Sequence, residues 1–142
     1  MCGIVGIAST KEIQERDWIN NAVNSIIHRG PDDFGIEWTD DNKIGFGHRR
    51  LSIIDLTKAG HQPMSNQEND LLIVFNGEIY NYLELRDELR AKGHLFKTNT
   101  DTEVIMASYR QWGTECLAKL NGMFVFALCD KGSQKVFFAR DR

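Results

Sequence analysis

The sequence predicts an α+β fold in which antiparallel sheets carry helices on their faces. Helical and strand patterns occur in blocks rather than in strict alternation, and two pairs of strands are separated by short polar turns. A chain of 142 residues is long enough for one hydrophobic core. Its composition, with 42% hydrophobic and 26% charged residues, is that of a folded globule and argues against disorder as the main state.

Strands are expected near both ends of the chain and in its middle. Residues 2–8 are apolar on both alternating faces, which predicts a central strand covered on both sides. Residues 71–75 predict another buried strand, which ends at Asn76-Gly77. Two sheets are therefore expected. Two further pairs of strands are predicted as hairpins, 34–38 with 43–48 and 123–129 with 135–139.

Helices are expected between these strands. Residues 12–28 carry apolar side chains at helical spacing, and a Gly-Pro pair soon after would end that helix. A second helix follows the capping-box pattern that begins at Asn81, and it ends at Gly93. A third begins after Asp101, a predicted cap, and is closed by Gly113.

The charge and hydropathy of the chain argue against a nucleic-acid or membrane partner. The 17 Lys and Arg residues and 20 Asp and Glu residues leave a net charge of -3, so no basic footprint for nucleic acid or an anionic membrane is present. The first residues lack a basic leader, and no window reaches the length of a membrane span. We therefore expect a cytoplasmic, soluble protein with no nucleic-acid or membrane partner.

The cysteines and histidines do not form a recognisable framework. Cys2, Cys116 and Cys129 are too few and too scattered for a disulfide scaffold or a zinc knuckle, which favours a reducing compartment. The four histidines are not spaced like metal ligands, so we expect structural or solvent-facing roles for them and no bound metal. Buried packing is the expectation for Cys116 and Cys129.

Cys2 is the residue that points most directly to chemistry. A small side chain after Met1 permits removal of the initiator methionine, which would leave a thiol and a free α-amine on one residue. The amine titrates near about 7.7–8.0 and an unperturbed thiol near about 8.5, so the amine can accept the thiol proton at little cost. Taken alone, Cys2 is better explained as an accidental cysteine that is merely buried.

A series of short motifs extends along the chain. The motifs are MCGIVGI (1–7), HRGPDD (28–33), GHRRLSIID (47–55), QPM (62–64), NGEIYN (76–81), DTEVI (101–105) and NGMF (121–124). In this order the motifs resemble the glutaminase domain of the class II glutamine amidotransferases, which are N-terminal-nucleophile hydrolases. The second and third motifs resemble the asparagine synthetase branch more than the glucosamine-6-phosphate synthase or amidophosphoribosyltransferase branches.

This resemblance implies a four-layer αββα sandwich in which antiparallel sheets lie between helices. It also implies that residues 1–142 are a glutaminase domain that is incomplete at its C-terminal end, and that an ATP-dependent synthetase domain is absent from this chain. ATP and Mg are expected only in that absent domain, and no cofactor is expected in this one. Open sheet edges would need cover from a partner copy in a homo-oligomer, an absent segment or another protein.

The resemblance assigns catalytic roles. Cys2 would attack the side-chain amide of glutamine and form a thioester, and the Asn76 side-chain amide beside the Gly77 backbone N–H would stabilise the oxyanion. The alternative for Asn76-Gly77 is a plain turn after a strand. Residues 29–35 resemble a loop that covers bound glutamine, although a helix stop explains the Gly-Pro pair equally well.

Substrate-binding residues follow in the same way. Arg50 would bind the α-carboxylate of free glutamine, and Glu78 and Asp101 its α-ammonium, while Asn76 and Gly77 also touch the substrate. The resemblance adds backbone groups of Ile53 and Ile54. The alternatives are that Asp101 only caps its helix and that Arg50 forms a surface ion pair.

These expectations predict an enzyme that hydrolyses L-glutamine to L-glutamate and ammonia for an asparagine synthetase-type domain or subunit. One alternative is a noncatalytic module that binds glutamine or serves assembly. Another is the glutaminase part of an amidotransferase that acts on a sugar or another metabolite, because the acceptor of the ammonia is chosen outside this domain.

Overall fold

The computed structural model describes residues 2–51 and 58–142, and within them the strands form two antiparallel sheets. Both hairpins expected from the sequence are present. One sheet has the order β1-β3-β2, made by β1 (Gly3–Ala8), β3 (Ile44–Arg50) and β2 (Asp33–Trp38). The other has the order β4-β5-β6-β7, made by β4 (Met64–Ser65), β5 (Leu71–Ile79), β6 (Gly122–Asp130) and β7 (Lys135–Arg140).

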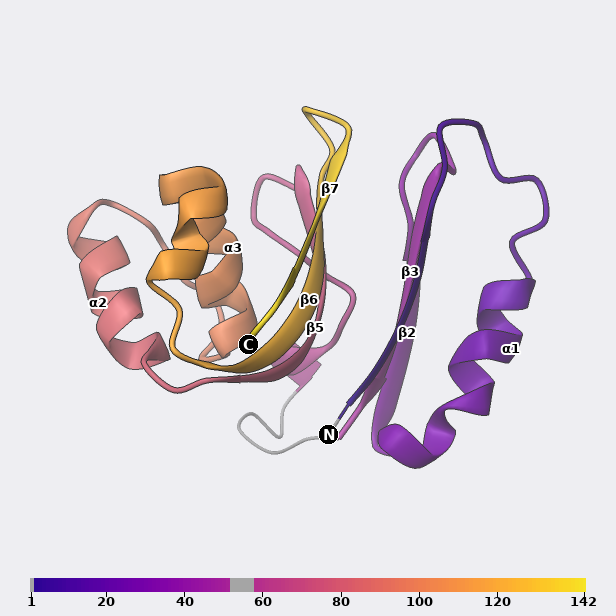
Figure 1. Cartoon of the computed structure of the whole chain (residues 1–142), viewed down its shortest axis with the longest axis horizontal. Helices are drawn as coiled ribbons and strands as arrows, with labels where there is room; N and C mark the ends of the chain where they lie inside the picture. The colour runs from indigo at the N-terminus through magenta and orange to yellow at the C-terminus, as the bar shows by residue number, and fades with distance from the viewer. Residues whose placement is uncertain (1, 52–57) are drawn as a thin grey trace.

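The helices cover the outer faces of the two sheets (Figure 1). Helix α1 (Trp18–Ser25) packs on β3 and β1, whereas α2 (Tyr82–Ala91) and α3 (Asp101–Trp112) lie on the far side of the other sheet. The result is the predicted α+β sandwich with the layer order αββα. Short 3₁₀ turns occupy Ile27–Arg29, Lys58–Gly60 and Gly113–Ala118.

Residues 71–75 of β5 are buried on both faces of the sheet. Ile73 and Phe75 belong to the cluster that the sheet forms with α2 and α3, whereas Leu72 and Val74 pack against Phe46 between the two sheets. Because successive side chains of a strand point to opposite faces, a strand with a layer on each side must be apolar at every position. This burial makes β5 a rigid support for the residues that continue it.

The central strand of the first sheet is not the one that the sequence predicted. β3 lies between β1 and β2, and all of its residues are buried, whereas β1 is an edge strand of this sheet in the described structure. The first sheet has a helix on one face and the second sheet on the other. Central and edge strands of such a sheet can therefore both carry apolar residues on their two faces. Hydrophobic pattern alone therefore could not identify the central strand.

The first helix is shorter than predicted. Residues 12–17 do not join α1, because their polar groups contact the turn between β2 and β3: the Ile13 N–H donates to the Asn42 carbonyl oxygen at 3.0 Å, and Arg16 Nη1 donates to Asn42 Oδ1 at 2.6 Å. A backbone N–H that donates to another loop cannot also donate to a carbonyl oxygen of its own helix.

Two predicted helix caps also differ in detail. Thr100, not Asp101, caps α3, with its Oγ1 accepting the Glu103 N–H at 3.3 Å. Asn81 precedes α2 as predicted, but its side chain accepts the Asn121 N–H at 2.9 Å instead of capping the helix. The Asp101 carboxylate is thereby available for another partner.

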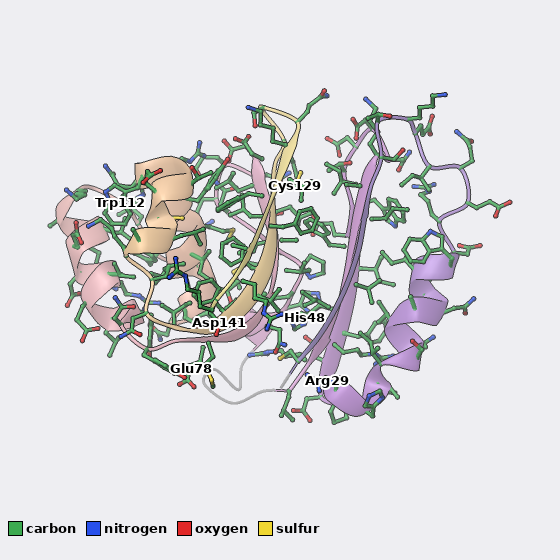
Figure 2. The ribbon with its side chains drawn as sticks, viewed as in Figure 1. Arg29, His48, Glu78, Trp112, Cys129 and Asp141 are labelled. Atoms are coloured by element: carbon green, nitrogen blue, oxygen red, sulfur yellow. The ribbon has the colours of Figure 1, made fainter. Side chains whose placement is uncertain are left out.

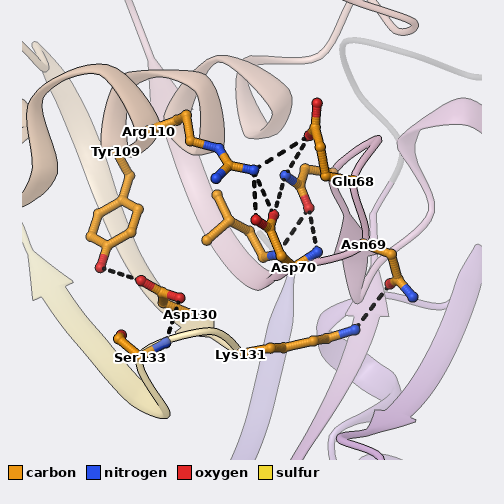
Figure 3. Close-up of polar contacts among 10 residues, drawn as sticks. Glu68, Asn69, Asp70, Tyr109, Arg110, Asp130, Lys131 and Ser133 are labelled. Atoms are coloured by element: carbon orange, nitrogen blue, oxygen red, sulfur yellow. Dashed lines mark hydrogen bonds and ion pairs between the residues drawn. The ribbon is translucent and has the colours of Figure 1, made fainter.

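A polar network fixes the turn before β5 to α3 (Figure 3). Arg110 Nη2 lies 2.7 Å from each carboxylate oxygen of Asp70, and Asn66 Nδ2 donates to the same carboxylate at 2.7 Å. The Tyr109 hydroxyl donates to Asp130 at 3.4 Å. Because the Arg110 and Asp70 side chains are 41% and 38% exposed, this ion pair contributes at most about 1 kcal/mol.

Candidate active site

A pocket of about 170 Å³ opens where the start of β1, the end of β3, the second half of β5 and the first turn of α3 meet. Ile53 and Ile54, which were also predicted to contribute, lie outside the described residues. The tertiary structure thus gathers site residues from four separate segments. The predicted residues that line the pocket are Cys2, Arg50, Asn76, Gly77, Glu78 and Asp101.

Cys2 directly precedes β1, and the sheet holds it against the end of β3. Its Sγ accepts the Leu51 N–H at 3.3 Å and lies 3.7 Å from the Leu51 carbonyl oxygen. Cys2 is half-buried and borders the pocket, whereas Cys116 and Cys129 are fully buried as predicted. Burial raises the pKa of each of these two thiols to about 11, so they are protonated at neutral pH.

The edge of β5 presents a row of backbone N–H groups at alternate residues. The Phe75 N–H donates to Gln62 Oε1 at 2.7 Å, and the Ile79 N–H donates to Asp101 Oδ2 at 3.1 Å. In an antiparallel strand alternate residues direct their N–H groups to the same side. Gly77 lies between these two, so its N–H faces the same edge, which is the wall of the pocket.

Asn76 and Gly77 lie within β5, so the interpretation of this pair as a turn after a strand is wrong. β5 continues to Ile79 and pairs Gly77 with Phe124 of β6. Gly77 has a φ of 151°, and a Cβ at this position would collide with the Met123 carbonyl oxygen. Glycine is therefore required here by both backbone conformation and space.

The pocket carries charges of both signs. Arg50 is only 8% exposed, so its side chain does not lie on the surface, and a Cβ on Gly60 would collide with its guanidinium. Asp101 is 5% exposed, and burial raises the pKa of its carboxyl, although the hydrogen bond from the Ile79 N–H acts in the opposite direction. Glu78 is exposed at the rim, and its charge adds to the rise in the Asp101 pKa.

Two buried polar residues of this region were not among the predicted site residues. Gln62, part of the motif at 62–64, is buried and lines the pocket. His48 points from β3 towards the other sheet (Figure 2), and its Nε2 donates to the Phe75 carbonyl oxygen at 3.1 Å. Burial lowers the pKa of His48 to about 4, so the ring is neutral, which agrees with the structural role predicted for it.

Residues 29–35 are divided between regular elements. Arg29 ends a 3₁₀ turn and Asp33 begins β2, so three residues, 30–32, connect the two. None of residues 29–35 is among those that line the pocket in the described structure. The α-helix α1 ends earlier than predicted, at Ser25, and Gly30 follows the short 3₁₀ turn that comes after it. Movement of residues 29–35 over a ligand stays a prediction.

The described residues, 2–51 and 58–142, show neither a metal cluster nor a membrane-spanning helix. Within these ranges no three His, Cys, Asp or Glu side chains gather closely enough to hold a metal ion. The helices of the same ranges are all too short or too polar to cross a membrane. The groups that the pocket offers to a ligand are thiol, amide, guanidinium and carboxylate.

The sequence pattern of the glutamine amidotransferase domain family matches residues 1–142. The chain belongs to this family. The resemblance inferred from the order of the motifs is therefore confirmed, and residues of every motif except the one at 28–33 line the pocket described above.

Curated relatives and a solved structure agree with this assignment. The chain is 45% identical over 145 residues to asparagine synthetase [glutamine-hydrolyzing] 1 of Bacillus subtilis, covering 99% of this chain and 22% of that protein. It is 40% identical over 146 residues to asparagine synthetase [glutamine-hydrolyzing] 3 of the same organism, covering 100% and 23%. The chain thus spans less than a quarter of the length of either relative.

The glutamine phosphoribosylpyrophosphate amidotransferase of Bacillus subtilis has a similar fold. Its structure superposes with a TM-score of 0.78 at 23% identity, covering 97% of this chain and 37% of that one. At this identity the similarity establishes the fold, and it agrees with the predicted layer order αββα.

Proposed function

We propose that this domain hydrolyses L-glutamine to L-glutamate and ammonia through a thioester on Cys2. The observation that carries the proposal is the pocket in which a thiol, an amide side chain, a strand-edge N–H, a guanidinium and two carboxylates meet. This set matches a free amino acid that carries a side-chain amide, since each charged end of the ligand has a group of opposite sign.

The charged groups orient the substrate. The buried guanidinium of Arg50 binds the α-carboxylate, for which its paired N–H donors have the right geometry. The α-ammonium lies against Asp101, with Glu78 contributing from the rim. An ammonium at this place compensates the unfavourable burial of the Asp101 charge. The charged carboxylate in turn favours binding of the ammonium. Backbone groups of Ile53 and Ile54 complete this part of the proposal.

The chemistry begins after Met1 is removed. The freed α-amine of Cys2 takes the thiol proton, and Sγ attacks the side-chain amide carbon of glutamine to form a tetrahedral intermediate. The amine returns the proton to the departing nitrogen, so the C–N bond breaks and ammonia leaves a thioester behind. Water then attacks the thioester carbon, gives a proton back to sulfur, and releases glutamate.

The oxyanion of both tetrahedral intermediates needs donors that are fixed before reaction. The Asn76 side-chain amide and the Gly77 N–H meet this need, because β6 pairs with both residues and the part of β5 before them is buried on both faces. Loss of one such donor typically costs about 2.7–4 kcal/mol of transition-state stabilisation. The acyl-transfer steps use these groups and no cofactor.

We further propose that the ammonia supplies an ATP-dependent asparagine synthetase-type domain or subunit. The names of the curated relatives support this acceptor, and ATP and Mg belong to that part of the reaction. We place the reaction in the cytoplasm, where the three free thiols remain reduced.

A matched pair of cysteine variants tests the proposal. Protein with a free Cys2 N-terminus, verified by mass, should release ammonia and glutamate from L-glutamine in equal amounts. The Cys2→Ala variant should release neither, and Cys116→Ala, which makes the same change at a buried thiol outside the pocket, should keep the activity. In the full-length protein, Cys2→Ala should still form asparagine from added ammonium.

Each alternative has its own result. Ammonia release that survives Cys2→Ala would refute the thioester. Glutamine binding without ammonia release, in protein whose Cys2 amine is free, would establish a noncatalytic binding or assembly module. Transfer of the ammonia to a sugar or another metabolite, with no asparagine formed, would contradict the proposed acceptor while leaving the hydrolysis intact.

A further inference from the structure

We infer that Gln62 is a positioning residue for this reaction, because its side chain fixes the strand edge that carries the oxyanion donors. The inference rests on the proposed function and adds to it a residue that touches neither the thiol nor, by this argument, the reacting amide. Gln62 is 6% exposed, lines the pocket, and uses both atoms of its amide within the site.

The first contact, from the Phe75 N–H to Gln62, lies where β4 no longer pairs with β5. β4 pairs with β5 only at Leu72 and Ile73, so the edge of β5 beyond Ile73 has no neighbouring strand from β4. At Phe75 the Oε1 of Gln62 takes the place of a strand carbonyl and accepts the N–H at 2.7 Å. A buried N–H without such a partner is unfavourable, so the contact holds this edge in place.

The Phe75 peptide groups are held at both ends. His48, from the opposite sheet, donates to the Phe75 carbonyl oxygen at 3.1 Å, while Gln62 binds the N–H. Phe75 directly precedes Asn76, and the N–H of Gly77 lies two residues further along the same edge. The direction of both oxyanion donors therefore depends on where these two side chains hold Phe75.

The second contact reaches the other end of the pocket. Gln62 Nε2 donates to Thr102 Oγ1 at 3.4 Å, and Thr102 follows Asp101 in the first turn of α3. The same amide therefore links the oxyanion edge of β5 to the residue next to the carboxylate that binds the ammonium. The bond at Phe75 is the shorter of the two, and we assign the larger effect to it.

The test compares kinetic constants of variants that differ in which contact they lose. Gln62→Met keeps the side-chain length and removes both contacts, whereas Thr102→Val removes only the acceptor of Nε2. Ser65→Ala is the control, because Ser65 follows Gln62 in the same segment, donates to Glu37 Oε1 at 3.3 Å, and does not line the pocket. Glutamine hydrolysis, thioester formation in a single turnover, and thermal unfolding are measured for each.

A misplacement of about 1 Å can cost about 100-fold in rate, so Gln62→Met should lower kcat and the rate of thioester formation by about 100-fold. Thr102→Val should keep kcat within about threefold, since the Phe75 contact remains. Ser65→Ala should match the wild type. Gln62→Glu, which retains an acceptor for the Phe75 N–H, should keep kcat within about tenfold and so provides the comparison if Gln62→Met does not fold.

Three results would overturn the inference. The first is a Gln62→Met protein with a lower melting temperature but wild-type kcat and KM, which is the signature of a purely structural residue. The second is a loss in Thr102→Val as large as in Gln62→Met. The third is a kcat in Gln62→Glu reduced as far as 100-fold. A wild-type protein that releases no ammonia would instead refute the proposed function, whatever the Gln62 variants do.

Discussion

Replacing Asp101 by Asn should separate substrate binding from fold stability. The Asn side chain has nearly the same size, and its Oδ1 can still accept the Ile79 N–H that Asp101 accepts at 3.1 Å. What the change removes is a buried negative charge that we propose to pair with the α-ammonium of glutamine. The helix keeps its cap, because the capping side chain is that of Thr100.

The effect on stability follows from the pKa of Asp101. Burial raises this pKa in the folded protein, so the folded state binds the carboxyl proton more tightly than the unfolded state does. The wild type therefore loses stability as the pH rises from the unfolded pKa, near about 3.9, through the folded pKa. At neutral pH, without ligand, Asp101→Asn should be at least as stable as the wild type, and the difference should shrink in acid.

Asp101→Asn should weaken the binding of L-glutamine strongly, although it does not destabilise the fold at neutral pH. Removing one partner of a buried charge pair costs about 2–5 kcal/mol, and about 1.36 kcal/mol corresponds to a factor of ten. Because Asp101 is 5% exposed, solvent screens this pair little. We expect the Kd for L-glutamine to rise by a factor between about 30 and about 5,000.

Calorimetric titration with L-glutamine measures this Kd in a Cys2→Ala background, where the ligand is not consumed. Urea unfolding at neutral and acidic pH measures the stability of the same proteins. Asp87→Asn is the control, since Asp87 is exposed on α2 and its partner Arg90 lies outside the pocket. Binding by Asp101→Asn within threefold of its parent would refute the assignment of the ammonium to Asp101.

Two further predictions concern Gly77 and the thiols. Gly77→Ala should destabilise the protein by about 1–3 kcal/mol in urea unfolding and lower the rate of ammonia release, because the added Cβ meets the Met123 carbonyl oxygen at a φ of 151°; unchanged stability and rate would contradict the argument. A thiol reagent at pH 8 should modify Cys2 rapidly and leave Cys116 and Cys129 unmodified until the protein unfolds, since thiols of pKa about 11 are only about 0.1% ionised there. Rapid modification of a Cys2→Ala protein under native conditions would show that one of the buried thiols is accessible.

The sequence by itself determined the class of fold and the identity of the chemical groups. Hairpins at residues 34–48 and 123–139 were predictable because their alternating patterns and polar turns are local properties. The family was predictable because short motifs stand in a fixed order along the chain. In particular, residue type and motif were enough to predict that Cys2 and Arg50 belong to one site, and both line the pocket. Their proposed roles in acyl transfer and carboxylate binding follow from their side chains.

Only the tertiary structure decided how those groups are held. The role that we propose for Gln62 depends on the pairing of β4 with β5 stopping at Ile73, so that the Phe75 N–H bonds a side chain instead of a strand. The place of Asn76-Gly77 inside β5 depends on β6, because pairing with a long neighbour continues a strand through a local turn signal. Such contacts join residues that are far apart in the chain. Local sequence patterns do not show which of these residues lie close together in space.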